Sequence, residues 1–259
     1  IIIRIIYKKG DMKYFDSDKN YRLVQKDNVH DFEVYKNGEK LPHIPDHKTL
    51  FKFYPNNEYS LDCLFRSYFY LSSPENFNDP FDCSTNLIKP NEFSDLNDLQ
   101  KRLYQDFGVC CLTEQIENLL MWSHYTNYYG FALEFKDFIF PKPTIEDLNL
   151  TSHKVIYPEN PCQMEVSGLN PIKYAIITKQ ALWSYEKEWR IICQPKQNNR
   201  ELKFQTKHVK AIYIGYRLHE KKRGMFNLIK EIIQTKYKNA KIFIVKPHKN
   251  ELKLDFMAY

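Results

Sequence analysis

The strongest chemical pattern in the sequence is a pair of glutamates two positions apart. Glu186 and Glu188 lie in the segment Trp183–Arg190, which reads WSYEKEWR. Alternate residues of an extended segment point to the same side, so the pattern predicts that both carboxylates face one cleft. One carboxylate could stabilise a developing positive charge while the other orients an acceptor. Alternatively, Arg190 neutralises the two glutamates on one face of a sheet and the tryptophans pack in the core.

A second polar cluster lies in the loop FNDPFD at residues 77–82. Asn and Asp side chains in such loops bond to the backbone or face a ligand. One interpretation is therefore a substrate-binding rim formed by Asn78, Asp79 and Asp82. The alternative is a loop whose polar groups satisfy one another. Two acids without further companions do not make a magnesium site, and no metal is expected here.

A third cluster at Trp122–Tyr125 reads WSHY and lies near the end of an expected helix, before Gly130. His124 could act as an acid or a base near neutral pH. Tyr125 could stack on a planar ring of a ligand. The alternative is that His124 is a hydrogen-bonded core residue on an aromatic helix.

The sequence lacks the motifs of several common types of functional site. It has only 7 glycines and contains no phosphate loop, dinucleotide-binding glycine motif, serine-hydrolase elbow or HExxH zinc motif. Its six cysteines form no CxxC pair and have no histidine at zinc-ligand spacing. We expect free thiols in a reducing cytoplasm, with a disulfide framework as the alternative.

Charge is distributed unevenly along the 259 residues. Residues 196–259 contain 16 lysines and arginines against 5 acidic residues, whereas residues 1–195 contain 22 against 27. The basic C-terminal region could contact a polyanion such as a nucleic acid. The alternative is a solvated, lysine-rich surface, because no arginine-rich stripe accompanies the lysines.

The apolar pattern predicts an α/β protein of mixed α+β type, in which helices flank a central mixed sheet. Residues 1–47 are polar and turn-rich and are expected to form a peripheral arm, and residues 48–259 a single domain. Strands are expected at 49–54, 67–73, 109–113, 131–135, 154–158, 188–194, 209–216 and 241–247. Helices are expected at 58–66, 91–106, 114–130, 171–180 and 219–237, the third of them capped by Thr113.

No apolar run is long enough to cross a bilayer, so no membrane segment is expected. Residues 1–11 lack the small-residue cleavage site of a secretory signal, and Met12 is a candidate start. We therefore expect a soluble, cytoplasmic protein.

Together the three clusters resemble the motifs of an uncharacterised bacterial family, domain-of-unknown-function family 2971. Those motifs are a K-x-Y strand, an SSPxxFNDPFD loop, a WSHY helix and a WxYExEWR turn. In this sequence they correspond to Lys52–Tyr54, Ser72–Asp82, Trp122–Tyr125 and Trp183–Arg190, with a later IxIG at Ile212–Gly215. The family carries no established activity.

The order of the elements also resembles the ADP-ribosyltransferase fold. That fold opens with a strand that bears a cofactor-binding polar residue, and a catalytic glutamate begins a late strand. The resemblance implies that Glu188 is the catalyst and that Glu186 meets the acceptor. The residues expected to bind NAD are Lys52, Tyr54, Ser123, His124, Tyr125 and Arg190. The opening strand lacks that family's usual arginine or histidine, so the residue near the dinucleotide stays open between Lys52 and Tyr54.

The leading hypothesis is an NAD-dependent ADP-ribosyltransferase-like enzyme, by analogy a bacterial toxin or phage-defence effector. NAD would be its substrate, and the acceptor would be a protein or a nucleic acid. Two alternatives remain. One is a non-enzymatic module that binds nucleic acid through the basic C-terminal region. The other is a metal-dependent nuclease that uses Asp79, Asp82, Glu186 and Glu188.

Overall fold

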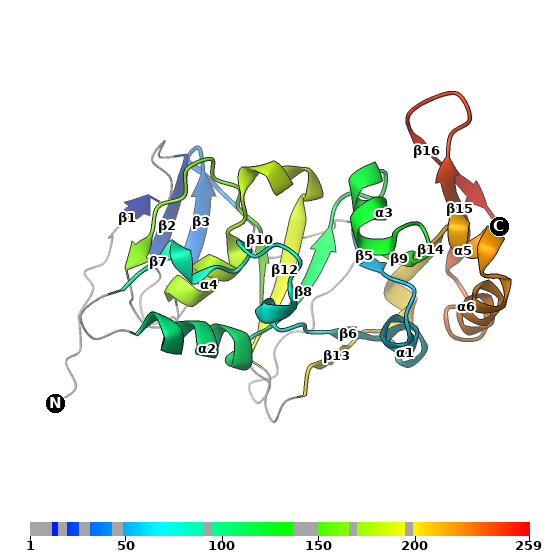
Figure 1. Cartoon of the computed structure of the whole chain (residues 1–259), viewed down its shortest axis with the longest axis horizontal. Helices are drawn as coiled ribbons and strands as arrows, with labels where there is room; N and C mark the ends of the chain where they lie inside the picture. The colour runs from blue at the N-terminus through cyan, green and yellow to red at the C-terminus, as the bar shows by residue number, and fades with distance from the viewer. Residues whose placement is uncertain are drawn as a thin grey trace.

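The computed structural model describes residues 12–14, 20–25, 32–42, 49–90, 95–136, 150–165, 170–194 and 199–259. Their largest element is an eight-stranded sheet that runs across the molecule (Figure 1). Its strands, in spatial order, are β10 (Thr151–Lys154), β12 (Glu188–Cys193), β8 (Gly108–Thr113), β5 (Leu50–Tyr54), β9 (Phe131–Phe135), β14 (Val209–Gly215), β15 (Lys241–Pro247) and β16 (Leu254–Ala258).

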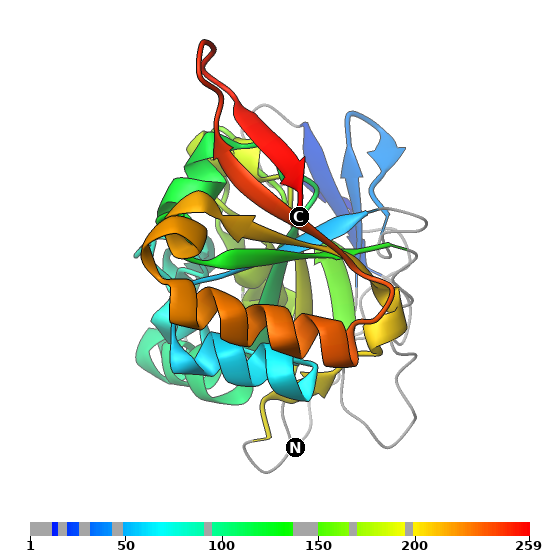
Figure 2. The same cartoon turned by 90° about the vertical axis from the view of Figure 1, so that its right-hand side faces the viewer.

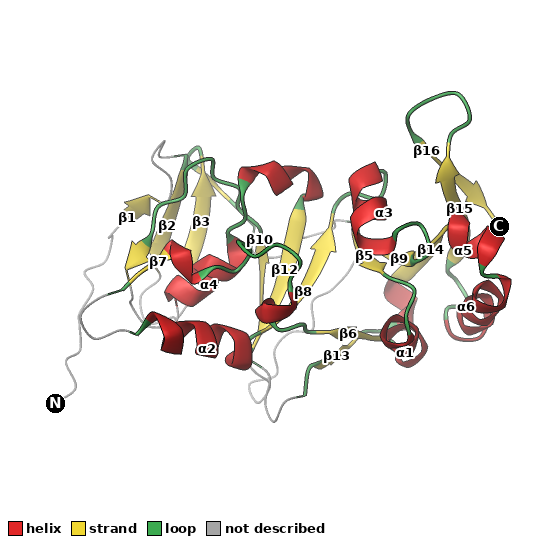
Figure 3. Ribbon diagram, viewed as in Figure 1, coloured by secondary structure: helices red, strands yellow, loops and turns green. Residues whose placement is uncertain are grey.

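The sheet is mixed, because β14 and β15 are parallel whereas the other neighbouring strands are antiparallel. Helices lie against it, so the predicted mixed α/β fold is confirmed (Figure 3). They are α1 (Glu58–Arg66), α2 (Leu96–Asp106), α3 (Leu119–Thr126), α4 (Asn170–Ile177), α5 (Tyr216–Lys221) and α6 (Arg223–Lys236).

The sheet divides between β5 and β8. Phe51 pairs with Thr113, and this is the only register pair between these two strands. In contrast, all five residues of β5 pair with β9 on the other side. The strands β5 and β8 thus meet at one end and separate along the rest of their length.

Three clusters of buried side chains pack around the divided sheet. One joins α1 and α6 to the sheet through residues such as Leu64, Phe226 and Ile229. Figure 2 shows these two helices side by side. A second includes Leu103 of α2 and Ile176 of α4, and the third centres on α3. The first cluster spans the separation, because it contains Leu112 of β8 as well as Leu133 of β9.

The segment before residue 48, expected as a peripheral arm, contains four strands: β1 (Met12–Tyr14), β2 (Tyr21–Gln25), β3 (Phe32–Lys36) and β4 (Glu39–Lys40). They form their own antiparallel sheet. Tyr21, Leu23 and Val34 are buried in the same cluster as residues of α2 and α4. This sheet therefore shares a core with the rest of the fold.

Several short elements join the larger ones. Pairs of small strands are β7 (Ile88–Lys89) with β11 (Met164–Glu165), and β6 (Tyr68–Tyr70) with β13 (Glu201–Lys203). Short 3-10 helices are η1 (Pro74–Asn76), η2 (Thr85–Leu87), η3 (Ala181–Glu186) and η5 (Thr206–His208). Of these, η3 leads directly into β12.

Two predicted helices differ in their bounds. Thr113 does not cap α3: Asn118 does, by accepting from the amides of Leu120 and Met121, while the Thr113 hydroxyl bonds to the Glu186 carbonyl. The helix expected at 219–237 is divided between α5 and α6 at Lys222, whose φ of −131° is not helical. The strand expected at 154–158 overlaps β10 only at Lys154, and beyond it Ile156 forms an isolated bridge with Thr178.

No helix among the described residues is long and apolar enough to cross a membrane. All six cysteines are free.

Candidate functional site

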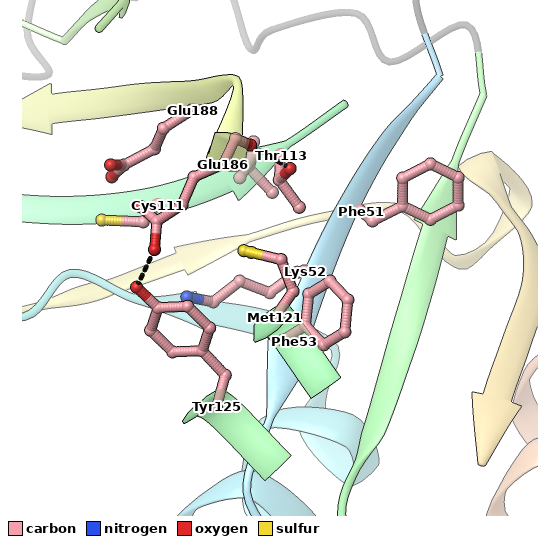
Figure 4. A pocket seen from close by; sticks show the side chains of 10 residues that line it. Phe51, Lys52, Phe53, Cys111, Thr113, Met121, Tyr125, Glu186 and Glu188 are labelled. Atoms are coloured by element: carbon pink, nitrogen blue, oxygen red, sulfur yellow. Dashed lines mark hydrogen bonds between the residues drawn. The ribbon is translucent and has the colours of Figure 1, made fainter. Parts of the chain in front are cut away.

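A pocket of about 340 Å3, partly open to solvent, lies where β5 and β8 separate. Side chains from β5, β8, α3, η3 and β12 reach it (Figure 4). Its lining residues are Phe51, Lys52, Phe53, Cys111, Leu112, Thr113, Met121, Tyr125, Glu186 and Glu188. The pocket therefore combines aromatic walls with one lysine and two carboxylates.

The two glutamates reach the pocket through a turn. Glu186 ends η3, Lys187 adopts a left-handed conformation with φ of 43°, and Glu188 begins β12. The prediction that both carboxylates face one cleft is met, but the segment is not extended as assumed. The left-handed Lys187 reverses the chain between them, with its side chain in solvent.

Behind the pocket, Arg190 is completely buried, with 0% of its surface exposed. It forms two bonds of 2.8 and 2.7 Å to the carboxylate of Asp82 in the FNDPFD loop. It also donates to Glu188, at 2.7 Å from Nε and 3.1 Å from Nη2. The guanidinium thus ties the loop at residues 77–82 to the head of β12 and fixes the Glu188 carboxylate in place.

Lys179, which follows α4, supplies a second buried cation. Its ammonium lies 2.6 Å from Glu186, 3.4 Å from Glu188 and 3.5 Å from Asp82. Trp183 covers it, with the ammonium 4.7 Å from a ring centroid. Three acids and two bases therefore form one buried cluster, which we call the ion cluster: Asp82, Lys179, Glu186, Glu188 and Arg190.

The negative charge of Glu186 is less well stabilised than that of Glu188. Burial and the neighbouring Glu188 carboxylate raise the pKa of Glu186, and Lys179 and Tyr125 offset this only in part. The Tyr125 hydroxyl donates to Glu186 Oε1 at 2.5 Å. Burial and the Glu186 charge also raise the pKa of Tyr125, so its phenol keeps its proton. Glu186 is therefore suited to exchanging a proton at the pocket.

Glu188 behaves in the opposite way. Burial opposes its ionisation, but Arg190 and Lys179 outweigh this and lower the pKa of Glu188 to about 2. Its backbone amide donates to the Tyr157 hydroxyl at 3.0 Å. Glu188 is thus a fixed anion at the pocket, while Glu186 beside it is a titratable group.

Lys52 and Tyr54, both expected near a dinucleotide, lie in different surroundings. Lys52 lines the pocket, and Figure 4 shows its ammonium directed toward Tyr125. Burial lowers the pKa of Lys52, but Cys110, Cys111 and Glu188 offset this and the pKa lies above its ordinary value overall. Tyr54 is buried in the apolar cluster beside α1 and stacks on Phe131. Of the two residues, Lys52 lines the pocket and Tyr54 does not, and the Lys52 ammonium lies 5.8 Å from the centroid of the Tyr54 ring.

Other predicted site residues lie outside the pocket lining. Ser123 and His124 are exposed on α3, and the His124 ring lies 6.0 Å from that of Trp183. Asn78 is exposed, and Asp79 accepts from the Phe81 amide at 2.9 Å within its own loop. Asp82 and Arg190 lie beneath the pocket in the ion cluster. The substrate rim expected from the FNDPFD loop does not form.

The ion cluster is a poor cation site. Among the described residues, no group of three or more His, Cys, Asp and Glu side chains has the arrangement of a metal site. Lys179 and Arg190 already occupy the carboxylates that a metal ion would need, and their charges would repel it. The geometry therefore does not favour the metal-dependent nuclease.

The sequence analysis missed Lys179, Cys111 and Thr113. Lys179 follows an apolar helix and has no partner nearby in sequence except Glu186 and Glu188, seven and nine positions later. A lysine that ends an apolar helix is a weak signal on its own. Cys111 alternates with the buried Cys110, and burial raises the pKa of its thiol well above the ordinary value.

Comparison with known proteins gives one match. No curated protein and no solved structure matches the chain, so the likeness to the ADP-ribosyltransferase fold receives no support from these comparisons. Residues 121–191 match the sequence model of the family described as "Protein of unknown function (DUF2971)". The matched segment contains Tyr125, Lys179, Glu186, Glu188 and Arg190, whereas Lys52 and Asp82 lie before it. The segment that brings most of these groups to the pocket is thus similar to the DUF2971 family. It contains the WSHY and WxYExEWR motifs, whereas the other three motifs lie outside the matched residues.

Proposed function

We propose that the pocket is an active site that cleaves NAD between nicotinamide and ribose and transfers ADP-ribose to an acceptor. The observation that supports the proposal best is the meeting of Lys52, Tyr125, Glu186 and Glu188 in one pocket. These residues come from three separate motifs of the sequence. Glu188 also begins a late strand, as the resemblance to ADP-ribosyltransferases requires.

The charges of the two glutamates fit two different tasks. Cleavage of the nicotinamide–ribose bond leaves positive charge on the ribose, and the permanently ionised Glu188 is placed to stabilise it. Oε2 of Glu188 already accepts from Arg190 and Lys179, whereas Oε1 accepts from Arg190 Nε, so a ribose hydroxyl can still donate to Oε1. Glu186 takes the proton of the attacking acceptor hydroxyl or water, and neutral nicotinamide leaves.

The lining of the pocket, with aromatic walls, one lysine and two carboxylates, suits one end of the dinucleotide. In the proposal, nicotinamide lies against Tyr125 and Phe53 with its ribose near Glu188, and the rest of NAD extends from the mouth. The ammonium of Lys52 then faces the negatively charged diphosphate.

The test is release of nicotinamide from NAD by the purified protein, measured by chromatography, together with transfer of labelled ADP-ribose to lysate components. We expect Glu188→Gln to reduce kcat by ~100-fold or more while KM for NAD changes little, because the lost charge acts on the transition state. The matched control is Glu117→Gln, since Glu117 is an exposed glutamate just before α3. Thermal melts show whether each variant is folded.

Glu188→Gln keeps an oxygen acceptor for Arg190, which Glu188→Ala would not. In Glu188→Ala, Arg190 keeps its two bonds to Asp82, but its buried Nε loses its acceptor, so this variant is expected to be less stable. Absence of nicotinamide release and of label transfer by the folded wild-type protein would falsify the proposed function.

A further inference from the structure

One row of paired residues joins the pocket to the far end of the sheet. Each residue in the row is the register partner of the next on the neighbouring strand. The row is Glu188, Thr113, Phe51, Glu134, Ala211 and Lys241. It begins at a pocket carboxylate and ends on β15. At about 4.8 Å per strand, five steps cover ~24 Å along the sheet.

Five exposed lysines gather at the β9–β14–β15 end of this row. The cluster, here called the lysine edge, consists of Lys136, Lys207, Lys210, Lys238 and Lys241. Topology places them together, because β9 ends where the parallel strands β14 and β15 begin. In Figure 2 the yellow η5, which leads into β14, lies on the same side as the turn from α6 into β15.

Hydrogen bonds confirm that these segments are neighbours. The Lys136 amide donates to the His208 carbonyl at 3.1 Å, and the turn before Lys241 is closed by an Ala240 amide bond of 2.8 Å to Tyr237. The segments 202–210 and 235–242 contain no acidic residue. Among the described residues, none of the five ammonium groups takes part in an ion pair. The lysine edge therefore carries uncompensated positive charge.

We propose that the lysine edge binds the phosphate backbone of a single-stranded nucleic acid, part of which then reaches the pocket. Lysines act as point charges toward phosphates without reading bases. Charge complementarity favours a polyanion, and the phosphate backbone of a nucleic acid presents regularly spaced negative charges to these lysines.

A single strand is favoured over a duplex, because only an unpaired nucleotide can enter the pocket without first leaving a base stack. The ~24 Å between the pocket and the lysine edge corresponds to about seven nucleotides at 3.4 Å each. The nucleic acid would then be the acceptor, a step that rests on the proposed function.

The test of binding is fluorescence anisotropy with a labelled single-stranded 16-mer, as RNA and as DNA, over a series of salt concentrations. The variant is Lys207→Gln/Lys210→Gln/Lys241→Gln. We expect it to weaken binding ~10-fold or more at low salt. Loss of three phosphate contacts lowers the slope of log K against log salt by about 2.

The matched control is Lys221→Gln/Lys222→Gln/Lys249→Gln. These three lysines are also exposed, but they follow the opposite ends of β14 and β15. The net charge falls by the same amount, so this variant is expected to bind as the wild type does. Equal weakening in both variants, or no binding at low salt, would overturn the proposal. So would stronger binding to phosphatidylserine vesicles than to the 16-mer.

A failure of nucleic-acid binding can be distinguished from a failure of the proposed NAD cleavage. Glu188→Gln is expected to bind the 16-mer normally, and the lysine-edge variant is expected to release nicotinamide from NAD at the wild-type rate. Transfer of label from NAD to the 16-mer should require both sites. Binding of the 16-mer without NAD consumption supports the lysine edge and contradicts the proposed NAD cleavage. NAD consumption without binding supports the proposed cleavage and contradicts the lysine edge.

Discussion

Two glutamates that look alike in the sequence have different electrostatic surroundings. Glu188 receives two cations, Arg190 and Lys179, and its pKa falls to about 2. Glu186 receives Lys179 and one phenol, and its pKa rises. The difference follows from where each side chain meets the buried guanidinium. A pair of groups with separated pKa values is the usual arrangement for one fixed charge and one proton carrier.

Removal of the Tyr125 hydroxyl should change the pKa of Glu186. The Tyr125 hydroxyl donates to the ionised form of Glu186 and lowers its pKa. Tyr125→Phe is therefore expected to raise the pKa of Glu186 further. Glu186 must be ionised to accept a proton, so with a higher pKa it accepts one only at higher pH. The acidic limb of the pH–rate profile for NAD cleavage should shift upward by about the same amount.

Carbon-13 NMR titration of labelled glutamate carboxylates measures the same shift without relying on activity. Tyr128→Phe serves as the control, because its hydroxyl bonds to the Leu119 carbonyl at 3.4 Å, away from the pocket lining. An unchanged Glu186 titration in Tyr125→Phe, or an equal shift in both variants, would show that the phenol does not set this pKa.

At the scale of elements, two glycines allow segments to approach closely. A Cβ on Gly130 would lie 2.0 Å from the Tyr54 carbonyl oxygen. A Cβ on Gly215 would lie 2.2 Å from the Tyr128 carbonyl oxygen. Both contacts are with backbone, which cannot move aside as a side chain can. These glycines let the turn after α3 rest against β5 and β14, which positions Tyr125 at the pocket.

Gly130→Ala is accordingly expected to destabilise the fold by about 3 kcal/mol. In a protein of this size that loss lowers Tm by roughly 6–12 °C, which differential scanning calorimetry can measure. Gly224→Ala is the control, because nothing lies within 4 Å of the added Cβ. In helix α6 this change should stabilise by ~0.5 kcal/mol. Similar melting temperatures for the two variants would contradict the close-approach argument.

The sequence predicted some elements better than others for physical reasons. The strands β5, β8, β9 and β14 lie in apolar runs that are buried in the centre of the sheet, and their signals are strong. The edge strand β16 is half exposed and has no such run. The division of α5 from α6 depends on the backbone angle of Lys222, which leaves no mark in the apolar periodicity.

The candidate site was predictable only in part. The spacing of Glu186 and Glu188 predicted that both carboxylates face one cleft. They do, although a turn and not an extended strand brings them there. Asp82 and Lys179 could not be assigned from local sequence, since their roles arise where the FNDPFD loop and the end of α4 meet β12. Contacts between segments about 100 residues apart, such as Arg190 with Asp82, need the tertiary fold.

At the scale of the whole molecule, the divided sheet should show in hydrogen exchange. Along its full length β8 pairs only with β12, whereas β9 pairs with both β5 and β14. Residues 108–113 are therefore expected to exchange roughly tenfold faster than residues 131–135, because fewer bonds must open. Mass spectrometry of deuterated peptides resolves these segments.

A ligand in the pocket should reduce this difference. Cys111, Leu112 and Thr113 line the pocket, so ADP-ribose or nicotinamide bound there is expected to slow exchange in residues 108–113. Exchange in the helix α6, remote from the pocket lining, is the internal reference. Equal protection of β8 and β9 in the free protein would contradict the divided sheet.

The buried guanidinium also has a consequence for related chains. Arg190 and Asp82 neutralise each other in the absence of water, and losing one partner of such a pair commonly costs ~3–5 kcal/mol. Natural drift at either position is therefore expected to require compensating change at the other. Relatives should retain both or replace both together, and those that replace both while retaining Glu188 would need another way to keep that carboxylate ionised. Co-inheritance of the two positions thus offers a signature for sorting relatives that share the chemistry from those that share only the fold.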